Sequence, residues 1–152
     1  MKKTAILIIM CFAALTMNAQ RFVDLGLPSG TKWATTNEKS ETSFFSFDEA
    51  VSQFGNRLPT KAQWEELKAE CLWSWTGSGY KVTGPNGNSI SLPAAGYRSC
   101  NGDVYYVGSY GNYWSSTPNG SEYAWGLLFY SGGVGMDYDA RCFGRSVRLV
   151  QD

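Results

Sequence analysis

Residues 111–150 read GNYWSSTPNGSEYAWGLLFYSGGVGMDYDARCFGRSVRLV and carry most of the information about how this chain folds. An apolar signature, NYWSST at 112–117, opens the segment, and an alternating strand, SVRLV at 146–150, closes it. Between them, residues 127–130 and 134–138 flank Ser131-Gly132-Gly133, which predicts a β-hairpin. The segment holds more aromatic side chains than one small core can bury. We therefore expect its two ends to hold the fold and its middle to display a binding surface.

The other end of the chain has the features of a secretory signal peptide. Lys2 and Lys3 precede an apolar run at 5–17, and Ala19 is a small residue at the expected cleavage point. The alternative is a membrane anchor, but the run is short for a stable span. We predict a signal peptide at 1–19 and a single domain at 20–152, secreted, periplasmic or on the cell surface.

Charge and composition exclude several classes of function. Cleavage would remove two of the 13 basic residues and leave 11 against 13 acidic residues, a net charge of −2 with no basic run. Nucleic-acid binding needs a positive surface, so it is not expected. The chain has no histidine, which excludes a histidine general base and imidazole ligation of a metal. No cofactor is expected.

Three cysteines remain after cleavage, at Cys71, Cys100 and Cys142. Export would place them in an oxidising compartment, where one pair can form a disulfide and one thiol is left over. The sequence leaves all three pairings open. Their wide spacing disfavours a zinc site.

Two helices and several short strands are predicted along the domain. Ser46 with Glu49, and Thr60 with Gln63, have the spacing of helix N-terminal capping boxes. Trp64, Leu67 and Cys71 then recur on one helical face, and we assign Trp64, Trp114 and Phe129 to the core. Short strands are predicted at 22–25, 31–35, 80–83, 89–92, 105–107 and 146–150, with a turn at Asn86-Gly87. We expect the strands at 22–25 and 146–150 to lie side by side. The pattern is that of an α+β fold.

Five motifs in order give the chain a specific resemblance. They are LPSGTKWA at 27–34, RLPTKAQWEEL at 57–67, LPAAGYR at 92–98, YWSST at 113–117 and SVRLV at 146–150. This succession resembles the Fibrobacter succinogenes major paralogous domain, a family common among exported proteins of Bacteroides-type gut bacteria. The resemblance covers nearly all of residues 20–152.

The resemblance implies a C-type lectin-like fold, with two helices packed on short antiparallel sheets and a loop-rich C-terminal half. It also implies a distant relation to formylglycine-generating enzymes and to the variable proteins of diversity-generating retroelements, whose C-terminal segments carry diversified contact residues. Relatives often have Cys where this chain has Thr36. The function of the family is largely undefined.

Enzymatic and metal-binding alternatives have weaker support in the sequence. A formylglycine-generating enzyme needs a copper-binding cysteine pair, and the motifs around Cys100 and Cys142 do not match one. Asp137 and Asp139 share a strand face, which suggests a glycosidase pair, but solvated acids at a hairpin end explain them as well. With Glu122, the same two acids offer oxygen ligands to Ca²⁺, yet the sugar-binding motifs of calcium-dependent lectins are absent.

The aromatic segment is the strongest functional feature. Tyrosine and tryptophan with Ser, Gly, Asn and Asp neighbours resemble the composition of antibody contact surfaces. The predicted ligand-binding residues are Tyr110, Asn112, Tyr123, Trp125, Tyr130, Asp137, Tyr138 and Asp139. We expect Tyr123, Trp125, Tyr130 and Tyr138 to project from one surface. The leading hypothesis is a non-enzymatic domain that binds an extracellular protein or glycan. The alternatives are a structural subunit of a surface assembly and a degenerate relative of formylglycine-generating enzymes.

Overall fold

The computed structural model describes residues 20–152, so the predicted signal peptide at 1–19 lies outside the described residues. In chain order the elements are β1 (Phe22–Asp24), β2 (Lys32–Ala34), α1 (Phe47–Phe54), the 3₁₀ turn η1 (Gly55–Arg57), α2 (Lys61–Glu70), β3 (Leu72–Trp75), β4 (Gly79–Thr83), β5 (Ser89–Pro93), β6 (Tyr97–Arg98), β7 (Val104–Tyr105), β8 (Gly111–Asn119), β9 (Tyr123–Tyr130), β10 (Gly133–Ala140) and β11 (Val150–Gln151).

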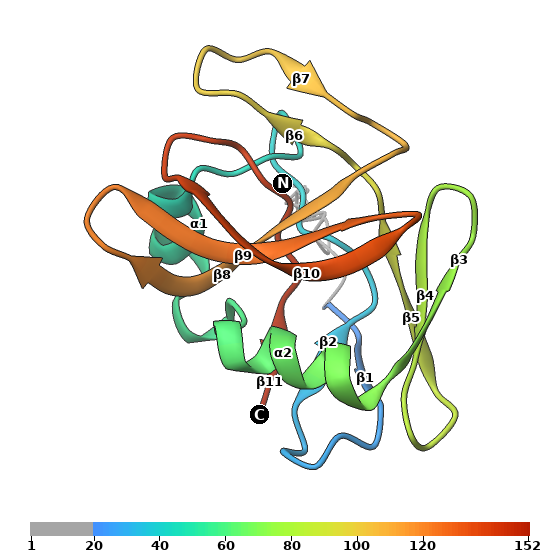
Figure 1. Cartoon of the computed structure of the whole chain (residues 1–152). Helices are drawn as coiled ribbons and strands as arrows, with labels where there is room; N and C mark the ends of the chain where they lie inside the picture. The colour runs from blue at the N-terminus through green and yellow to red at the C-terminus, as the bar shows by residue number, and fades with distance from the viewer. Residues whose placement is uncertain (1–19) are drawn as a thin grey trace, which may run out of the picture.

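The strands of residues 20–152 form four small antiparallel sheets, ordered β1-β2-β11, β3-β4-β5, β10-β9-β8 and β6-β7. Sheet β8–β10 crosses the middle of the molecule, with α2 along one side and the β6–β7 hairpin on the other (Figure 1). The α+β prediction is confirmed. The C-terminal half is less loop-rich than expected, because β8, β9 and β10 have nine, eight and eight residues.

Both helices begin at the capping boxes that the sequence predicts. The hydroxyl of Ser46 accepts a hydrogen bond from the backbone N–H of Glu49, and the Glu49 carboxylate accepts one from the backbone N–H of Ser46. Thr60 and Gln63 form the same pair at the start of α2. These bonds satisfy N–H groups that have no partner inside the helix. Helix α1 ends at Gly55, whose positive φ of 54° suits a helix terminus.

Sheet β8–β10 has a hydrophobic core on each face, because alternate residues of a strand point to opposite sides. Tyr113, Leu127 and Phe129 belong to the larger core, which lies between the sheet and α2. Trp114 and Ala124 belong to a smaller core on the face that contacts α1. The predicted core position of Trp64 is confirmed, since its side chain is fully buried in the larger core.

An irregular stretch of β8 fixes the N-terminus of α2 to the sheet. Pairing between β8 and β9 shifts register between Trp114 and Pro118. Within this stretch, the N–H of Ser116 donates to the Pro59 carbonyl at 2.7 Å. The hydroxyl of Thr117 accepts from the N–H at the start of α2 at 3.0 Å. Ser116 and Thr117 of the YWSST motif therefore join strand β8 to the start of α2.

The C-terminal strand differs from the prediction. Strand β11 pairs with β2, which lies between it and β1, so residues 22–25 and 146–150 do not lie side by side. Only Val150–Gln151 forms the strand. Alternating apolar residues predict a strand but do not identify its neighbour.

Buried polar bonds hold the residues just before β11. Arg148 is 1% exposed, and its guanidinium donates to the carbonyls of Ala34 and Ser91 at 2.9 and 2.7 Å. It also donates twice to the side-chain oxygen of Asn37, at 2.9 and 2.7 Å. Burial lowers the pKa of Arg148 from its ordinary value. The segment is therefore held by side-chain bonds as well as by the sheet.

Cys100 and Cys142 form a disulfide between residues 42 positions apart. Cys71 is the one free cysteine among residues 20–152, and it is buried at the end of α2.

Within the same residues, no helix is both long and apolar enough to cross a bilayer.

We expect the thiol of Cys71 to be unreactive in the folded protein. Burial, with Glu70 and Glu66 nearby, raises the pKa of the Cys71 thiol to about 11, so about one thiol in a thousand is ionised at pH 8. Iodoacetamide should label native protein about 100-fold more slowly than urea-unfolded protein, and the native rate should rise as pH approaches 11. Equal native and unfolded rates at pH 8, read by mass spectrometry, would contradict this.

Candidate functional site

A cleft of about 250 Å³ lies between the β6–β7 hairpin and sheet β8–β10. We call it the aromatic cleft. Four aromatic side chains, two carboxylates, an amide and an aliphatic side chain line it: Tyr97, Tyr106, Tyr110, Phe143, Asp137, Asp139, Asn112 and Leu128. It adjoins a shallower depression of about 410 Å³ along the β9–β10 hairpin, with which it shares Leu128 and Asp137.

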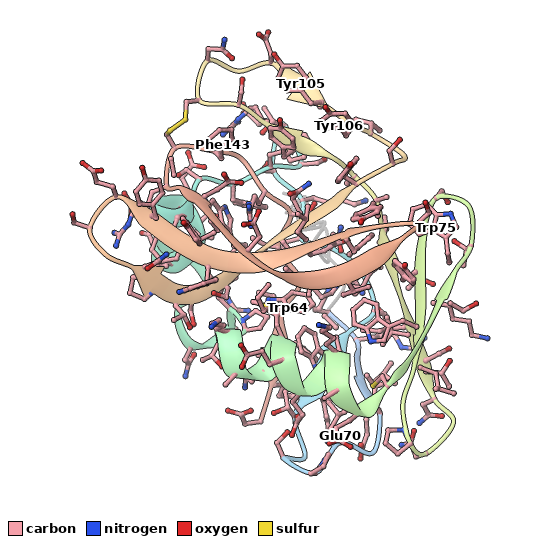
Figure 2. All side chains as sticks on the ribbon, viewed as in Figure 1. Trp64, Glu70, Trp75, Tyr105, Tyr106 and Phe143 are labelled. Carbon is pink, nitrogen blue, oxygen red and sulfur yellow. A yellow bond between two sulfur atoms is a disulfide. The ribbon has the colours of Figure 1, made fainter. Side chains whose placement is uncertain are left out.

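Covalent and backbone bonds hold the β6–β7 hairpin over the sheet. The Cys100–Cys142 disulfide joins the turn of this hairpin to the loop that follows β10 (Figure 2). Beside it, Arg98 and Gly144 exchange backbone hydrogen bonds of 2.9 and 2.8 Å. The N–H of Gly96 donates to the Tyr110 carbonyl at 2.7 Å. The hairpin is therefore bonded both to the loop after β10 and to the segment just before β8, so the cleft between the hairpin and the sheet is preformed.

A continuous row of aromatic rings runs along one side of the cleft and into the adjoining depression, and we call it the aromatic wall: Phe143, Tyr97, Tyr106, Tyr110 and Tyr130. Successive ring centroids are 5.8, 6.1, 4.8 and 5.5 Å apart. Tyr106 on the β6–β7 hairpin and Phe143 on the C-terminal loop are labelled in Figure 2. Such a row offers rigid apolar faces to a ligand at low cost in side-chain entropy.

The backbone of Tyr106 has an unusual conformation. Its φ is 57°, a left-handed value that is uncommon for a bulky residue and costs on the order of 1–3 kcal/mol. The N–H groups of Ser109 and Tyr110 both donate to its carbonyl, at 3.0 and 3.1 Å, and so stabilise this conformation. The Tyr106 side chain is 57% exposed. Strain at an exposed aromatic residue of a cleft is typical of a functional position.

The floor of the cleft contains two acids and a buried base. Arg145 is fully buried, its Nη2 pairs with Asp139, and it lies 4.0 Å from a carboxylate oxygen of Asp137. Its guanidinium carbon lies 4.7 Å from the ring centroid of Trp114. Gly126 provides the space for this arrangement, since a Cβ there would collide with Nη1 of Arg145. Two carboxylates against one guanidinium leave the floor with a net charge of −1.

The amide of Asn112 lacks a hydrogen-bond acceptor. Asn112 is 4% exposed and lines the cleft, and its Nδ2 has no partner within residues 20–152. A buried donor without an acceptor costs about 1–3 kcal/mol. Because Nδ2 is itself buried, a ligand oxygen in the cleft would satisfy this group once the Asn112 amide turns toward it.

Burial, and to a smaller extent neighbouring charge, changes the acidity of Tyr97 in the cleft. Burial raises the pKa of Tyr97 above its ordinary value, and Tyr106, Asp139 and Tyr105 raise it further.

Within residues 20–152, no group of three or more Cys, Asp or Glu side chains is placed to hold a metal ion. The calcium alternative based on Glu122, Asp137 and Asp139 therefore has no support from the geometry.

The structure divides the eight predicted ligand-binding residues between two faces of sheet β8–β10. Tyr110, Asn112, Asp137 and Asp139 line the aromatic cleft, and Tyr130 stacks beside Tyr110. The other three, Tyr123, Trp125 and Tyr138, lie on the opposite face, beyond the larger core and α2 that cover the rest of it; we call this exposed part the outer face. The prediction that Tyr123, Trp125, Tyr130 and Tyr138 share one surface is wrong, because Tyr130 lies an odd number of positions from Tyr123 and Trp125 in one regular strand.

The aromatic residues of the outer face contact one another and helix α2. The Tyr138 ring packs edge-on against Tyr123 and Trp125, with centroids 5.8 and 5.3 Å apart. Lys61 at the start of α2 lies 4.1 Å from the Trp125 ring centroid and pairs with Glu65 at 3.3 Å. This packing joins the hairpin to α2, so the cluster has a structural explanation.

Sequence reasoning missed Tyr97, Tyr106, Phe143, Leu128 and Arg145. Three of these come from the β6–β7 hairpin region and the loop that the disulfide joins to it. The sequence signal that could have located this part of the site is a pair of cysteines. Cys100 lies three residues after Tyr97, and Cys142 lies one residue before Phe143. With the pairing left open, that signal could not be used.

Comparison with known proteins gives a family but no function. Residues 65–150 match the family described as a domain of unknown function, DUF8237. The matched region runs from α2 to β11, and it contains the cleft and its covering hairpin. No curated protein and no solved structure matches the chain.

Proposed function

The chain belongs to the DUF8237 family, and we propose that it is a secreted or surface-displayed, non-enzymatic domain of C-type lectin-like fold that binds an extracellular ligand in the aromatic cleft. The five ordered motifs that resemble the Fibrobacter succinogenes major paralogous domain support the fold and the location. Two helices with small antiparallel sheets are compatible with that fold. The disulfide suits an oxidising compartment.

The observation that carries this proposal is the unpartnered amide of Asn112 beneath the aromatic wall. Ligand sites combine apolar surface with a few polar groups that are not satisfied by the protein itself. Here the wall supplies rings, Asn112 supplies a donor without a partner, and Asp137 supplies a carboxylate that makes no hydrogen bond within residues 20–152 and has Arg145 at 4.0 Å. No other cavity described in residues 20–152 has this combination.

Several features favour binding over catalysis. The cysteines that would correspond to a copper-binding pair are joined in a disulfide, and the remaining thiol, Cys71, is buried with a raised pKa. Asp139 is neutralised by Arg145, so it is poorly suited to act as the acid of a glycosidase pair.

The second candidate is a structural subunit of a surface assembly. The exposed side chains of the β6–β7 hairpin favour it, because Val104, Tyr105 and Val107 are 49%, 43% and 68% exposed. Such a subunit would co-purify with a partner and would not need the floor of the cleft. A binding domain would lose its ligand when the cleft alone is altered.

The test compares two exposed tyrosines, one next to β7 in the aromatic wall and one in β9 on the outer face. Tyr106→Gly removes a ring of the wall and places glycine where φ is positive, so stability should change by less than about 1 kcal/mol. Binding on a glycan array and to intact bacterial cells should fall at least tenfold. The matched control is Tyr123→Ala, which removes a 43% exposed tyrosine from the outer face and should leave binding unchanged.

A third variant tests the adjoining depression. A Cβ at Gly135 would meet nothing within 4 Å, so Gly135→Leu should fold and fill this space. It should weaken binding of extended ligands more than binding of small ones. Parent-like binding by Tyr106→Gly, or equal loss in Tyr106→Gly and Tyr123→Ala, would show that the cleft is not the site.

A further inference from the structure

We propose that the aromatic cleft recognises one sugar ring that carries a free, positively charged amino group, as in a hexosamine unit of a glycan. This inference rests on the proposed ligand-binding function and specifies the chemistry of the ligand. Three features of the cleft each match a different part of such a ring. The negative floor matches the amino group, the unsatisfied donor of Asn112 matches a hydroxyl oxygen, and the aromatic wall matches the apolar face.

The charge of the floor requires a cation. Asp139 is paired with Arg145, but Asp137 makes no hydrogen bond within residues 20–152, and Arg145 lies 4.0 Å away. The Asp137 side chain is 44% exposed, so a ligand can reach its carboxylate. No lysine lines the cleft. An ammonium group would form a charge-assisted hydrogen bond with Asp137, whereas an acidic sugar would face a net negative floor.

The donor of Asn112 requires an oxygen on the same ligand. An ammonium group has donors only, so a simple alkylamine would leave Nδ2 of Asn112 unpaired. A sugar hydroxyl next to the amino group both accepts and donates. Hydroxyl and ammonium groups on neighbouring ring carbons therefore match a free donor and a free carboxylate in one cleft.

The aromatic wall requires an apolar face. One face of a sugar ring presents C–H groups that pack on tyrosine and phenylalanine, and a cation beside a ring gains further attraction. The cleft volume of about 250 Å³ is below the roughly 300–1,000 Å³ of sites for drug-sized ligands, which suits a single ring. The adjoining depression, lined by Leu128 and residues 133–137 among others, gives room for the next unit of a chain.

The experiment uses three methyl glycosides that differ only at the second ring carbon: methyl glucosaminide, methyl glucoside and methyl N-acetylglucosaminide. Each is titrated into the protein and followed by calorimetry. We expect the glucosaminide to bind at least about tenfold more tightly than the other two. Ammonium chloride at the same concentration controls for salt, and lysine amide controls for an amine without a sugar ring.

Asp137→Asn is the decisive variant. It should fold normally, because Asp137 is half-exposed, makes no hydrogen bond within residues 20–152, and leaves Arg145 its closer partner Asp139; it should bring the three glycosides to equal affinity. The matched control is Asp103→Asn, which makes the same charge change at an exposed acid outside the cleft and should keep the preference.

The outcomes separate this inference from the proposed function. Equal affinity of the three glycosides for the parent protein would overturn the amino-group inference and leave a neutral sugar site. Tight binding of lysine amide without any glycoside would overturn it in favour of a protein ligand. If no probe binds while Tyr106→Gly still loses array or cell binding, the inference fails and the function stands. If Tyr106→Gly also has no effect, both fail.

Discussion

A protein truncated after Arg145 is expected to lose its cooperative unfolding transition. The missing residues include Val147, Leu149 and Val150, which are 0%, 1% and 2% exposed, and burial of such side chains contributes about 1.5–3 kcal/mol each. Loss of Arg148 also leaves the buried carbonyl of Ala34 without this donor, at about 1–3 kcal/mol, and removes a partly buried hydrogen bond to the Ser91 carbonyl. The sum is comparable with the roughly 5–15 kcal/mol that stabilises a typical domain.

Circular dichroism melts of the truncated protein test this expectation. The control is removal of Asp152 alone, whose side chain makes exposed or partly buried hydrogen bonds and which should shift stability by less than about 1 kcal/mol. A truncated protein that melts cooperatively at the parent temperature would show that the terminal segment is dispensable. In that case the position of β11 in sheet β1-β2-β11 would not contribute to folding.

Local chemistry made the helices and hairpins predictable. Capping boxes at Ser46 and Thr60 depend on residues three positions apart, and both are present in the structure. The turn at Asn86-Gly87 likewise joins two strands, β4 and β5, with the expected ends to within a residue. Strand β3 was missed because residues 72–75 directly follow the helix and are mostly apolar, so no turn residue separates the two elements.

Long-range features of the fold were not predictable in the same way. Arg145 and Arg148 are almost completely buried, although arginine is rarely buried without partners. Arg145 pairs with Asp139, six positions away, but the partners of Arg148 are two carbonyls and an amide oxygen 57–114 positions away in the sequence. Nothing in a single sequence links residues so far apart.

The candidate site shows both the value and the limit of strand periodicity. Periodicity correctly places Asp137 and Asp139 on one face of β10 and Met136 and Tyr138 on the other. It also separates Tyr130 from Trp125, which the aromatic composition alone does not do. The cleft itself depends on the β6–β7 hairpin, and that hairpin is positioned by a disulfide whose pairing the sequence left open.

Replacing Trp114 by alanine is expected to destabilise the protein by about 3–5 kcal/mol, the range for large aromatic truncations in cores. Its side chain is fully buried, and its ring lies against Phe47 with centroids 5.6 Å apart. Its Nε1–H donates to the Phe45 carbonyl at 2.7 Å, and Arg145 lies over the ring. Alanine would therefore leave a cavity and a buried cation without its aromatic partner, while the Phe45 carbonyl would keep only the backbone N–H of Arg145 as a donor.

Urea unfolding of two further variants separates these contributions. Trp114→Phe keeps most of the ring but loses the hydrogen bond to the Phe45 carbonyl, which still accepts from the backbone N–H of Arg145, so the lost bond should cost about 0.5–1.5 kcal/mol. Trp125→Ala removes a partly buried tryptophan from the outer face and should cost less than Trp114→Ala, because its packing is open to solvent on one side. A loss below about 1 kcal/mol for Trp114→Ala would mean that the smaller core does not stabilise the fold. A folded Trp114→Ala protein should also bind ligand more weakly, since Arg145 holds Asp139 in the floor of the cleft.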